Sequence, residues 1–232
     1  MDQEALTIPN HIGFIMDGNR RWATAHSIPE MDGHLSGYNA MKEVLTAAYD
    51  AGIKYVTLYA FSSENWNRKN EEVTKLMGLA ISAVATDLKF LIEKEVKVVF
   101  LGRRDGLSDK VLASLKKAEA ATASLARATL AVCFNYGGRQ EIIDAVQACI
   151  ADGLTAEDIT EDAISAHMYH PEIPPLDMIV RTSGEQRLSN FMLWRADYSE
   201  LYFLKKYWPD MTKEDVADSI VEYNKRKRRY GV

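Results

Sequence analysis

The chain has 232 residues, enough to bury a substantial core in one large domain or two small ones. Hydrophobic residues make up 47% and charged residues 26% of it, which is the composition of an ordinary soluble globular protein. A formal net charge of −5 argues against general nucleic-acid binding, so we expect no nucleic-acid partner.

The two cysteines and the lack of long apolar runs indicate a reducing compartment. Cys133 and Cys149 are too few for a disulfide framework or a zinc set, and both lie in apolar or helical stretches, which predicts buried thiols. The first eleven residues carry no signal segment, and no stretch approaches the roughly 18 apolar residues of a membrane span. We therefore expect a cytoplasmic protein with at most peripheral membrane contact.

The stretch from Ile12 to Ala23 changes character in its middle. An apolar run typical of a buried strand ends at Asp17-Gly18-Asn19, and two arginines follow at once. A carboxylate, a flexible glycine and cations at a helix start suit a metal and a phosphorylated ligand held together. The alternative is a tight turn from strand to helix, with Asp17 as a helix cap and both arginines in solvent.

The rest of the chain alternates between strand and helix patterns. Strands are predicted over 53–61, 96–101, 128–134, 177–180 and 201–204, and helices over 33–51, 71–95, 108–125, from the turn after 139 to 151, and from Thr212 into the basic run 225–229. Thr155 and Thr160 are typical caps of short helices. The alternation predicts an α/β fold with a mainly parallel sheet flanked by helices. With no linker or repeat, residues 1–232 are expected to form a single domain.

Polar residues follow the predicted carboxyl ends of five strands. They are Asp17 and the stretches 62–68, 103–105, 135–139 and 181–185. Parallel strands end at one edge of their sheet, where such folds bind ligands. We expect these five segments to converge there.

Five motifs together resemble the cis-prenyltransferase family, and most of all bacterial undecaprenyl diphosphate synthases. They are M-D-G-N-x-R-W-A at 16–23, G-H at 33–34, Y-A-F-S-S-E-N-W-x-R at 59–68, N-Y-G-G-R at 135–139 and R-T-S-G-E-x-R-x-S-N-F at 181–191. The resemblance implies Mg²⁺-dependent condensation of isopentenyl diphosphate onto an allylic diphosphate such as farnesyl diphosphate. The expected product is a long-chain polyprenyl diphosphate, undecaprenyl diphosphate in particular, a lipid carrier for cell-wall synthesis.

The resemblance also assigns a role to each matching residue. Asp17, Asn19 and Ser62 match catalytic positions, and Asp17 with Glu200 matches the carboxylates near the metal. The matching substrate-binding residues are Gly18, Arg21, Trp22, His34, Asn65, Trp66, Arg68, Arg181, Arg187 and Ser189. Arg20, at the unspecified position of the first motif, is a further candidate for substrate binding. Among these, Arg181, Arg187 and Ser189 match the isopentenyl diphosphate site, and guanidinium groups suit phosphate oxygens. Neither Asn19 nor Ser62 is an obvious base by its intrinsic pKa, so the proton acceptor stays open.

Three further expectations come from the resemblance. The apolar stripe of helix 71–95 would wall a hydrophobic tunnel for the prenyl chain, although its spacing equally fits ordinary core packing. A homodimer is expected, with 200–204 and the last helix in the contact, where Arg229-Tyr230-Gly231 matches the family's C-terminal ending. Glu30 departs from the pattern, because the family usually has an arginine four residues before the G-H histidine.

Two other functions compete with this interpretation. A non-catalytic family member serving as a scaffold or partner subunit would have no need of residues for both diphosphates. A Mg²⁺-dependent phosphohydrolase with Asp17 as nucleophile would need a second acid nearby, and Asp17-Gly18-Asn19 offers only an amide.

Overall fold

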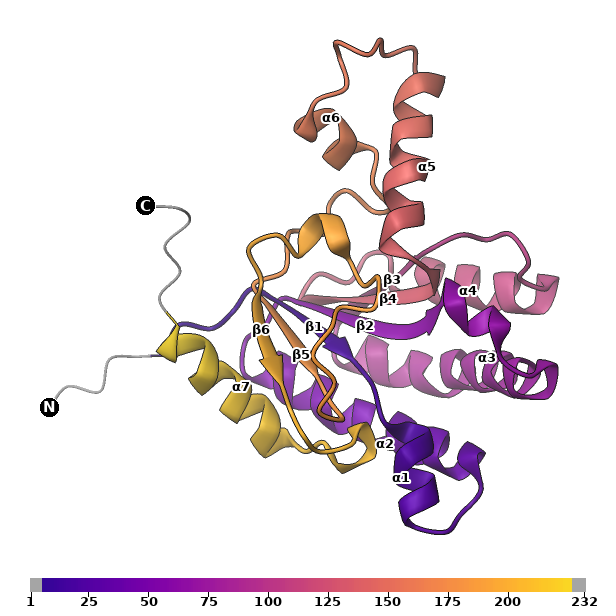
Figure 1. The fold of residues 1–232 in the computed structure, drawn as a ribbon, viewed down its shortest axis with the longest axis vertical. Coiled ribbons are helices and arrows are strands. Elements are labelled where there is room, and N and C mark those ends of the chain that lie inside the picture. Colours follow the sequence, from indigo (N-terminus) through magenta and orange to yellow (C-terminus); the bar gives the residue numbers. More distant parts are fainter. Residues whose placement is uncertain (1–5, 227–232) are drawn as a thin grey trace, which may run out of the picture. The chain divides into compact units, whose positions relative to one another are not determined.

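The computed structural model describes residues 6–226 and has an α/β fold built on a mainly parallel sheet (Figure 1). Its strands are β1 (His11–Ile15), β2 (Tyr55–Ser62), β3 (Val96–Leu101), β4 (Ala128–Tyr136), β5 (Met178–Arg181) and β6 (Glu200–Phe203). They follow the order β3-β4-β2-β1-β5-β6. The pairings of β1 with β2 and β5, of β3 with β4, and of β5 with β6 are all parallel, which confirms the predicted fold class.

The helices lie in the chain largely where the sequence predicted them. They are α1 (Asn19–Ala25), α2 (Glu30–Asp50), α3 (Asn70–Glu93), α4 (Asp109–Thr122), α5 (Gly138–Ala151), α6 (Glu161–Ala166) and α7 (Lys213–Lys225), with short 3-10 turns η1 (Ser63–Asn67), η2 (Leu193–Arg195) and η3 (Trp208–Asp210). No helix within residues 6–226 is long and apolar enough to cross a membrane. The end of the basic run and Arg229-Tyr230-Gly231 lie outside the described residues.

The helix start predicted after Gly18 is confirmed, since α1 begins at Asn19, although the sequence predicted no end for this helix. Two details of the predicted elements were wrong. Helix α2 begins at Glu30 rather than Gly33, because its first turn carries acidic residues that suit a helix N-terminus but give no apolar spacing. Thr155 caps no helix. The Asp158 carboxylate accepts hydrogen bonds from the backbone and hydroxyl of Thr155 and so closes a turn, whereas Thr160 does cap α6.

The described residues divide into two compact units, and the boundary falls inside β2 after Leu58. The first unit consists of the chain up to Leu58 with 175–187 and the segment from Ala196 onward, and the second consists of 59–174 and 188–195. The single domain expected for the whole chain stays a prediction.

In the first unit, Trp208 joins three elements. Its side chain is buried, its ring lies 5.9 Å from that of Phe14 in β1, and its indole N–H donates to the Gly37 carbonyl of α2 at 2.8 Å. Its backbone N–H donates to the carbonyl of Asp17 at 3.1 Å. The residue after β1 is therefore held by the core itself, and α2 also packs against α1 and α7.

In the second unit, β3 pairs with β4 along the whole length of β3, and α3 and α4 pack against β3 and against each other. Helix α5 leaves the end of β4 and packs against α6 (Figure 1). Both predicted thiols are buried here, Cys133 in β4 and Cys149 in α5.

A buried ion pair fixes α5 to η2. Glu141 is fully buried and its Oε1 lies 2.7 Å from Nη1 of Arg195, a side chain with 5% of its surface exposed. The Tyr136 hydroxyl and the Tyr169 backbone N–H also donate to Glu141. The second guanidinium nitrogen donates to the Tyr169 carbonyl at 2.7 Å, so both charges are satisfied.

Arg195→Ala should therefore strongly destabilise the protein, because it leaves the Glu141 carboxylate buried without its counter-ion. We expect the free energy of unfolding in urea to fall by about 3–5 kcal/mol. Lys225→Ala is the matched control, since it removes a cation from an exposed pair with Glu222 and should cost no more than about 0.5 kcal/mol. Equal losses for the two variants would contradict this role of Arg195.

Candidate functional site

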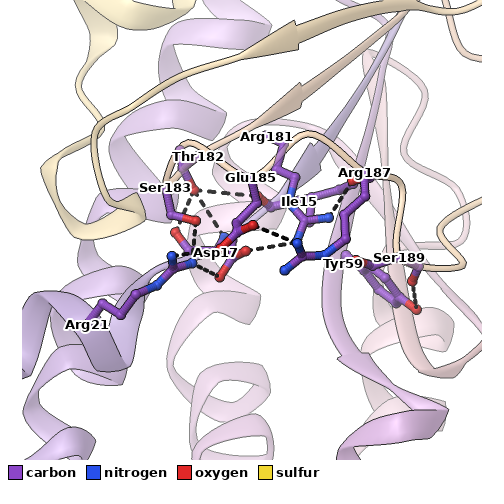
Figure 2. A network of polar contacts seen from close by, with 10 residues as sticks. All are labelled: Ile15, Asp17, Arg21, Tyr59, Arg181, Thr182, Ser183, Glu185, Arg187 and Ser189. Atoms are coloured by element: carbon purple, nitrogen blue, oxygen red, sulfur yellow. Dashed lines mark hydrogen bonds and ion pairs between the residues drawn. The ribbon is translucent and has the colours of Figure 1, made fainter.

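The Asp17 carboxylate, directly after β1, lies between two guanidinium groups (Figure 2). Its Oδ2 is 2.8 Å from Nη2 of Arg181, at the end of β5, and its Oδ1 is 3.1 Å from Nη2 of Arg21, in α1. Partial burial would raise the pKa of Asp17, but the hydrogen bonds and charges of Arg181 and Arg21 outweigh it and lower that pKa. Asp17 is therefore ionised, and it is an ion-pair partner rather than the helix cap of the alternative interpretation.

Thr182 holds the end of β1 against the end of β5. Its hydroxyl donates to the Asp17 carbonyl at 2.6 Å and accepts from the Asp17 backbone N–H at 3.0 Å. The placement of Asp17 thus follows from the pairing of two neighbouring parallel strands, of which Ile15 and Arg181 are register partners.

Glu185 gives this cluster a second carboxylate, which the sequence analysis did not assign. It is 3.0 Å from Arg21 and 2.6 Å from Arg187, whose guanidinium lowers the pKa of Glu185 (Figure 2). Arg21 also donates to the Ser183 hydroxyl at 2.6 Å. The cluster holds the cations Arg21, Arg181 and Arg187 against the anions Asp17 and Glu185. Its formal charge is +1, and an incoming anion can take the place of Glu185.

Gly18 is required where it stands. Its φ of +105° is in the region that favours glycine. A Cβ here would lie 2.7 Å from Cδ1 of Tyr207 and 3.0 Å from Cβ of Ser183. The glycine therefore lets the start of α1 approach the residues that hold Arg21.

The carboxamide of Asn19 lies against α2. Its Oδ1 is buried without a hydrogen-bond partner, and a Cβ on Gly37 would come within 2.2 Å of it. A Cβ on Gly33 would likewise meet the Asn19 carbonyl at 2.3 Å. A carboxamide has no basic nitrogen, so Asn19 can orient a substrate oxygen but is not a base.

The other predicted residues of the first unit lie on the same two helices. Arg20 pairs with Glu30 at 3.0 Å, and each side chain has 51% of its surface exposed. Trp22 donates to Asp210 at 2.7 Å and stacks on His26, so it ties α1 to η3. His34, directly after Gly33 in α2, is partly exposed.

In the second unit, four of the predicted residues lie in η1 or beside it. The Ser62 hydroxyl and the Asn65 side chain cap each other's backbone N–H groups. Trp66 donates to the Asn135 side chain at 2.7 Å, and Arg68 pairs with Glu72 at 2.8 Å.

Ser189, after the unit boundary at 187, has a left-handed backbone with φ of +50°. Its carbonyl accepts from the Tyr59 hydroxyl at 3.2 Å (Figure 2).

The expected convergence of the strand-end segments is confirmed within each unit. Asp17 meets the 181–185 segment in the first. In the second, the Asn135 side chain bonds Trp66 and donates to the carbonyls of Arg103 and Asp105.

The two predicted metal ligands do not meet within the described chain. Glu200 begins β6 level with Met178, which is level with Ile12 near the start of β1, whereas Asp17 lies beyond the other end of that strand. Glu200 instead pairs with Arg226 at 3.4 Å. Residues 6–226 contain no group of three or more His, Cys, Asp or Glu that could hold a metal ion.

Comparisons with known proteins agree with this arrangement. Residues 15–231 match the family described as "Putative undecaprenyl diphosphate synthase". An isoprenyl transferase of Thermotoga maritima is 44% identical, over 97% of this chain and 98% of its own.

Two solved structures are similar over nearly the whole chain. Lavandulyl diphosphate synthase from Lavandula x intermedia, in complex with dimethylallyl diphosphate, has a TM-score of 0.91 and 31% identity, covering 97% of this chain and 99% of its own. A probable undecaprenyl diphosphate synthase from Campylobacter jejuni has a TM-score of 0.84 and 26% identity, covering 98% and 100%.

The parallel sheet and the cationic cluster at its strand ends, together with these likenesses, define a transferase of the prenyl diphosphate synthase class. The chain belongs to the undecaprenyl diphosphate synthase family, as the five motifs predicted.

Gly18→Ala should be costly in two separable ways. Strain from the positive φ alone is on the order of 1 kcal/mol, and the contacts with Tyr207 and Ser183 add to it. Gly52→Ala is the control, because Gly52 has a φ of +98° and nothing within 4 Å of the position that a methyl group would take. We expect urea unfolding to show a clearly larger loss for Gly18→Ala, and equal losses would mean that the crowding at Gly18 is harmless.

Proposed function

We propose that this transferase is a Mg²⁺-dependent cis-prenyltransferase. It condenses isopentenyl diphosphate onto an allylic diphosphate, farnesyl diphosphate for example, and forms a long-chain polyprenyl diphosphate. The observation that carries the proposal is the Asp17 cluster, where an ionised carboxylate and three guanidinium groups stand at the carboxyl end of parallel strands. The named relatives extend this support to prenyl diphosphate chemistry.

The allylic diphosphate is assigned to the start of α1. Gly18 and Asn19 supply backbone and carboxamide N–H donors there, Arg21 supplies a guanidinium, and helix N-termini favour anions. The motif match assigns the same substrate to Trp22, His34, Asn65, Trp66 and Arg68. Arg20 is assigned to it as a neighbouring cation. A diphosphate would displace Glu185 from Arg21, exchanging one anion for another without leaving the guanidinium unpaired.

Asp17 is the residue assigned to Mg²⁺. Mg²⁺ is commonly held by one or two carboxylates together with substrate phosphate oxygens, so an ionised carboxylate beside a diphosphate site fits the donor set. The bound ion would offset negative charge on the departing diphosphate. Glu200 is assigned as a second carboxylate near the metal only by the family resemblance, since within the described chain it lies at the other end of the strands.

Isopentenyl diphosphate is assigned to Arg181, Arg187 and Ser189. The Arg181 guanidinium is oriented by Asp17 and by the Arg187 carbonyl, and the exposed Arg187 side chain pairs with Glu185. Guanidinium groups held in this way suit bidentate phosphate binding. Ser189 is supported by its place in the same motif.

The family match assigns Asn19 and Ser62 to the region near the proton that isopentenyl diphosphate loses. Asn19 carries a carboxamide, whose NH₂ group can orient oxygen atoms but is not a base for the proton. The Ser62 hydroxyl donates to the Glu64 carboxylate and accepts from the Asn65 backbone N–H, which leaves one lone pair of its oxygen as an acceptor. The departing diphosphate is the remaining candidate for the base.

Helix α3 is assigned to the growing prenyl chain. Apart from Val73 and Leu91, which are buried, and Ile92, which is exposed, its large apolar side chains are only partly buried, namely Leu76, Met77, Leu79, Ile81, Val84, Leu88 and Phe90. The stripe is therefore not a filled core. A lipid covering it would contribute about 0.8 kcal/mol for each buried CH₂.

Undecaprenyl diphosphate, as a lipid carrier for cell-wall synthesis, is the product we propose. We further propose a cytoplasmic homodimer that uses 200–204 and α7 for much of its contact and touches membranes only peripherally. Sedimentation at micromolar concentration would test the dimer.

The test of the function is incubation with Mg²⁺, farnesyl diphosphate and labelled isopentenyl diphosphate, followed by chromatography of the lipid fraction. A long polyprenyl product supports the proposal, and its length identifies the carrier. No product would favour a scaffold or partner subunit, and free phosphate alone would favour a phosphohydrolase.

Asp17→Ala should reduce turnover to less than about a tenth of the parent value, a loss of more than about 1.4 kcal/mol in transition-state stabilisation. The variant also removes the counter-ion of Arg181, which has 4% of its side chain exposed, so some loss of stability is expected. Asp17→Asn keeps the side-chain shape and serves as the control for packing. Parent turnover in Asp17→Asn would remove the metal role of Asp17.

Glu30→Arg should lower the Michaelis constant for the allylic substrate. In the parent protein Glu30 neutralises Arg20, and the substitution releases that cation from the pair and adds another. The constant for isopentenyl diphosphate should change by less than about twofold, a difference near 0.4 kcal/mol.

Arg20→Ala provides the cross-check for this pair. It should weaken allylic binding more in the parent than in the Glu30→Arg background, because two groups that serve one ligand are not additive. If Glu30→Arg alters neither constant, the pair is an exposed surface contact without a part in binding.

A further inference from the structure

Asn190 joins three segments of the second unit. Its Oδ1 accepts from the backbone N–H of Arg139 at 2.8 Å, and its Nδ2 donates to Oε1 of Glu64 at 2.9 Å. Its own carbonyl accepts from the N–H of Gly138 at 2.8 Å. The start of α5, the turn η1 and the 188–192 segment therefore meet at this residue.

The junction is too close for any larger residue. A Cβ on Gly137 would lie 2.7 Å from the Ser63 hydroxyl and 2.8 Å from Nδ2 of Asn190. A Cβ on Gly138 would lie 3.0 Å from the Asn190 carbonyl. The two glycines of N-Y-G-G-R thus bring the start of α5 within hydrogen-bond reach of Asn190.

The 188–192 segment is strained around Asn190. Ser189, Asn190 and Met192 all have positive φ, at 50°, 65° and 41°. Asparagine tolerates this region, but serine and methionine adopt it only with strain. Such a backbone persists only when its surroundings hold it, and the three hydrogen bonds of Asn190 do so.

Glu64 links Asn190 to Ser62 through hydrogen bonds. Burial raises the pKa of Glu64, but hydrogen bonds from Asn190, from its own backbone N–H and from the hydroxyls of Ser62 and Ser63 outweigh burial and lower it. The carboxylate is thus an ionised acceptor whose orientation depends on Asn190. It fixes in turn where the Ser62 hydroxyl points.

We propose that Asn190 is a positioning residue, which orients the Ser62 hydroxyl through Glu64 and holds Ser189 in its left-handed conformation. The inference rests on the proposed function, which gives Ser62 and Ser189 to isopentenyl diphosphate. Asn190 itself is assigned to neither substrate. Substitution of Asn190 should therefore impair the reaction of isopentenyl diphosphate. The Michaelis constant for the allylic substrate should change by less than about twofold, a difference in binding free energy under about 0.5 kcal/mol.

The kinetic test exchanges the carboxamide at Asn190 and the carboxylate at Glu64. Asn190→Asp keeps the acceptor for Arg139 but places a second carboxylate against Glu64, and kcat/KM for isopentenyl diphosphate should fall at least about tenfold. Glu64→Gln alone should lose less. When both substitutions are combined, the carboxamide introduced at position 64 donates to the carboxylate introduced at position 190. The hydrogen bond is then restored with its direction reversed, and kcat/KM should recover to within about threefold of the parent.

Asn224→Asp is the matched control, because the Asn224 side chain also accepts one hydrogen bond and donates another, both with the backbone of Thr7, but lies on α7. Its kinetic constants should match the parent. The proposal is overturned if Asn190→Asp matches the parent as well. It is also overturned if the double variant is no better than Asn190→Asp, since Glu64 would then act through its charge and not through this bond.

A second measurement does not depend on activity. Amide hydrogen exchange followed by NMR should speed up at least about tenfold at Gly138 and Arg139 in Asn190→Ala, with the later turns of α5 unchanged. Unchanged exchange at both amides overturns the proposal even if the kinetics agree. If the parent makes no polyprenyl product while exchange responds as expected, the proposed function fails and the junction at Asn190 stands.

Discussion

The carboxylate of Asp17 is the constraint on which the first unit depends. Two guanidinium groups from different elements reach it, one from the end of β5 and one from α1, and Thr182 and Trp208 bind its backbone. Without that charge, the two cations would repel each other across a partly buried space. The same charge that prepares the site for a diphosphate therefore also holds the ends of two strands and a helix in place.

Most strands and helices could be predicted from the sequence because the patterns that mark them are local. Apolar runs marked β3, β4 and β5, and glycine or threonine marked the end of α2 and the start of α7. Only the start of α1 was predicted and not its extent, because the helix has seven residues and only Ala23 is buried. The short polar helix lacks the apolar periodicity on which such a prediction rests.

Partners within the site were harder to predict than its residues. Asp17, Arg21 and Arg181 stood out by type and position, but that Glu185 joins Arg21 to Arg187 depends on how the 181–187 segment turns back. Asn190 and Glu64 are 126 positions apart, and each stood unremarked inside a motif. Glu200 matched a carboxylate of the family, yet strand register places it away from Asp17, which residue type alone does not reveal.

The packing of α1 on α2 limits how this protein can be engineered for thermal tolerance. Replacing helical glycine by alanine is a standard route to a more stable helix, with a gain of up to about 1 kcal/mol. Gly33 and Gly37 cannot be replaced by alanine in this way, because the Asn19 carbonyl and carboxamide occupy the space that a methyl group needs. Gly78 in α3 has nothing within 4 Å of that position and remains open. The two glycines, which have a low helix propensity, are thus needed in α2 because α1 packs against them.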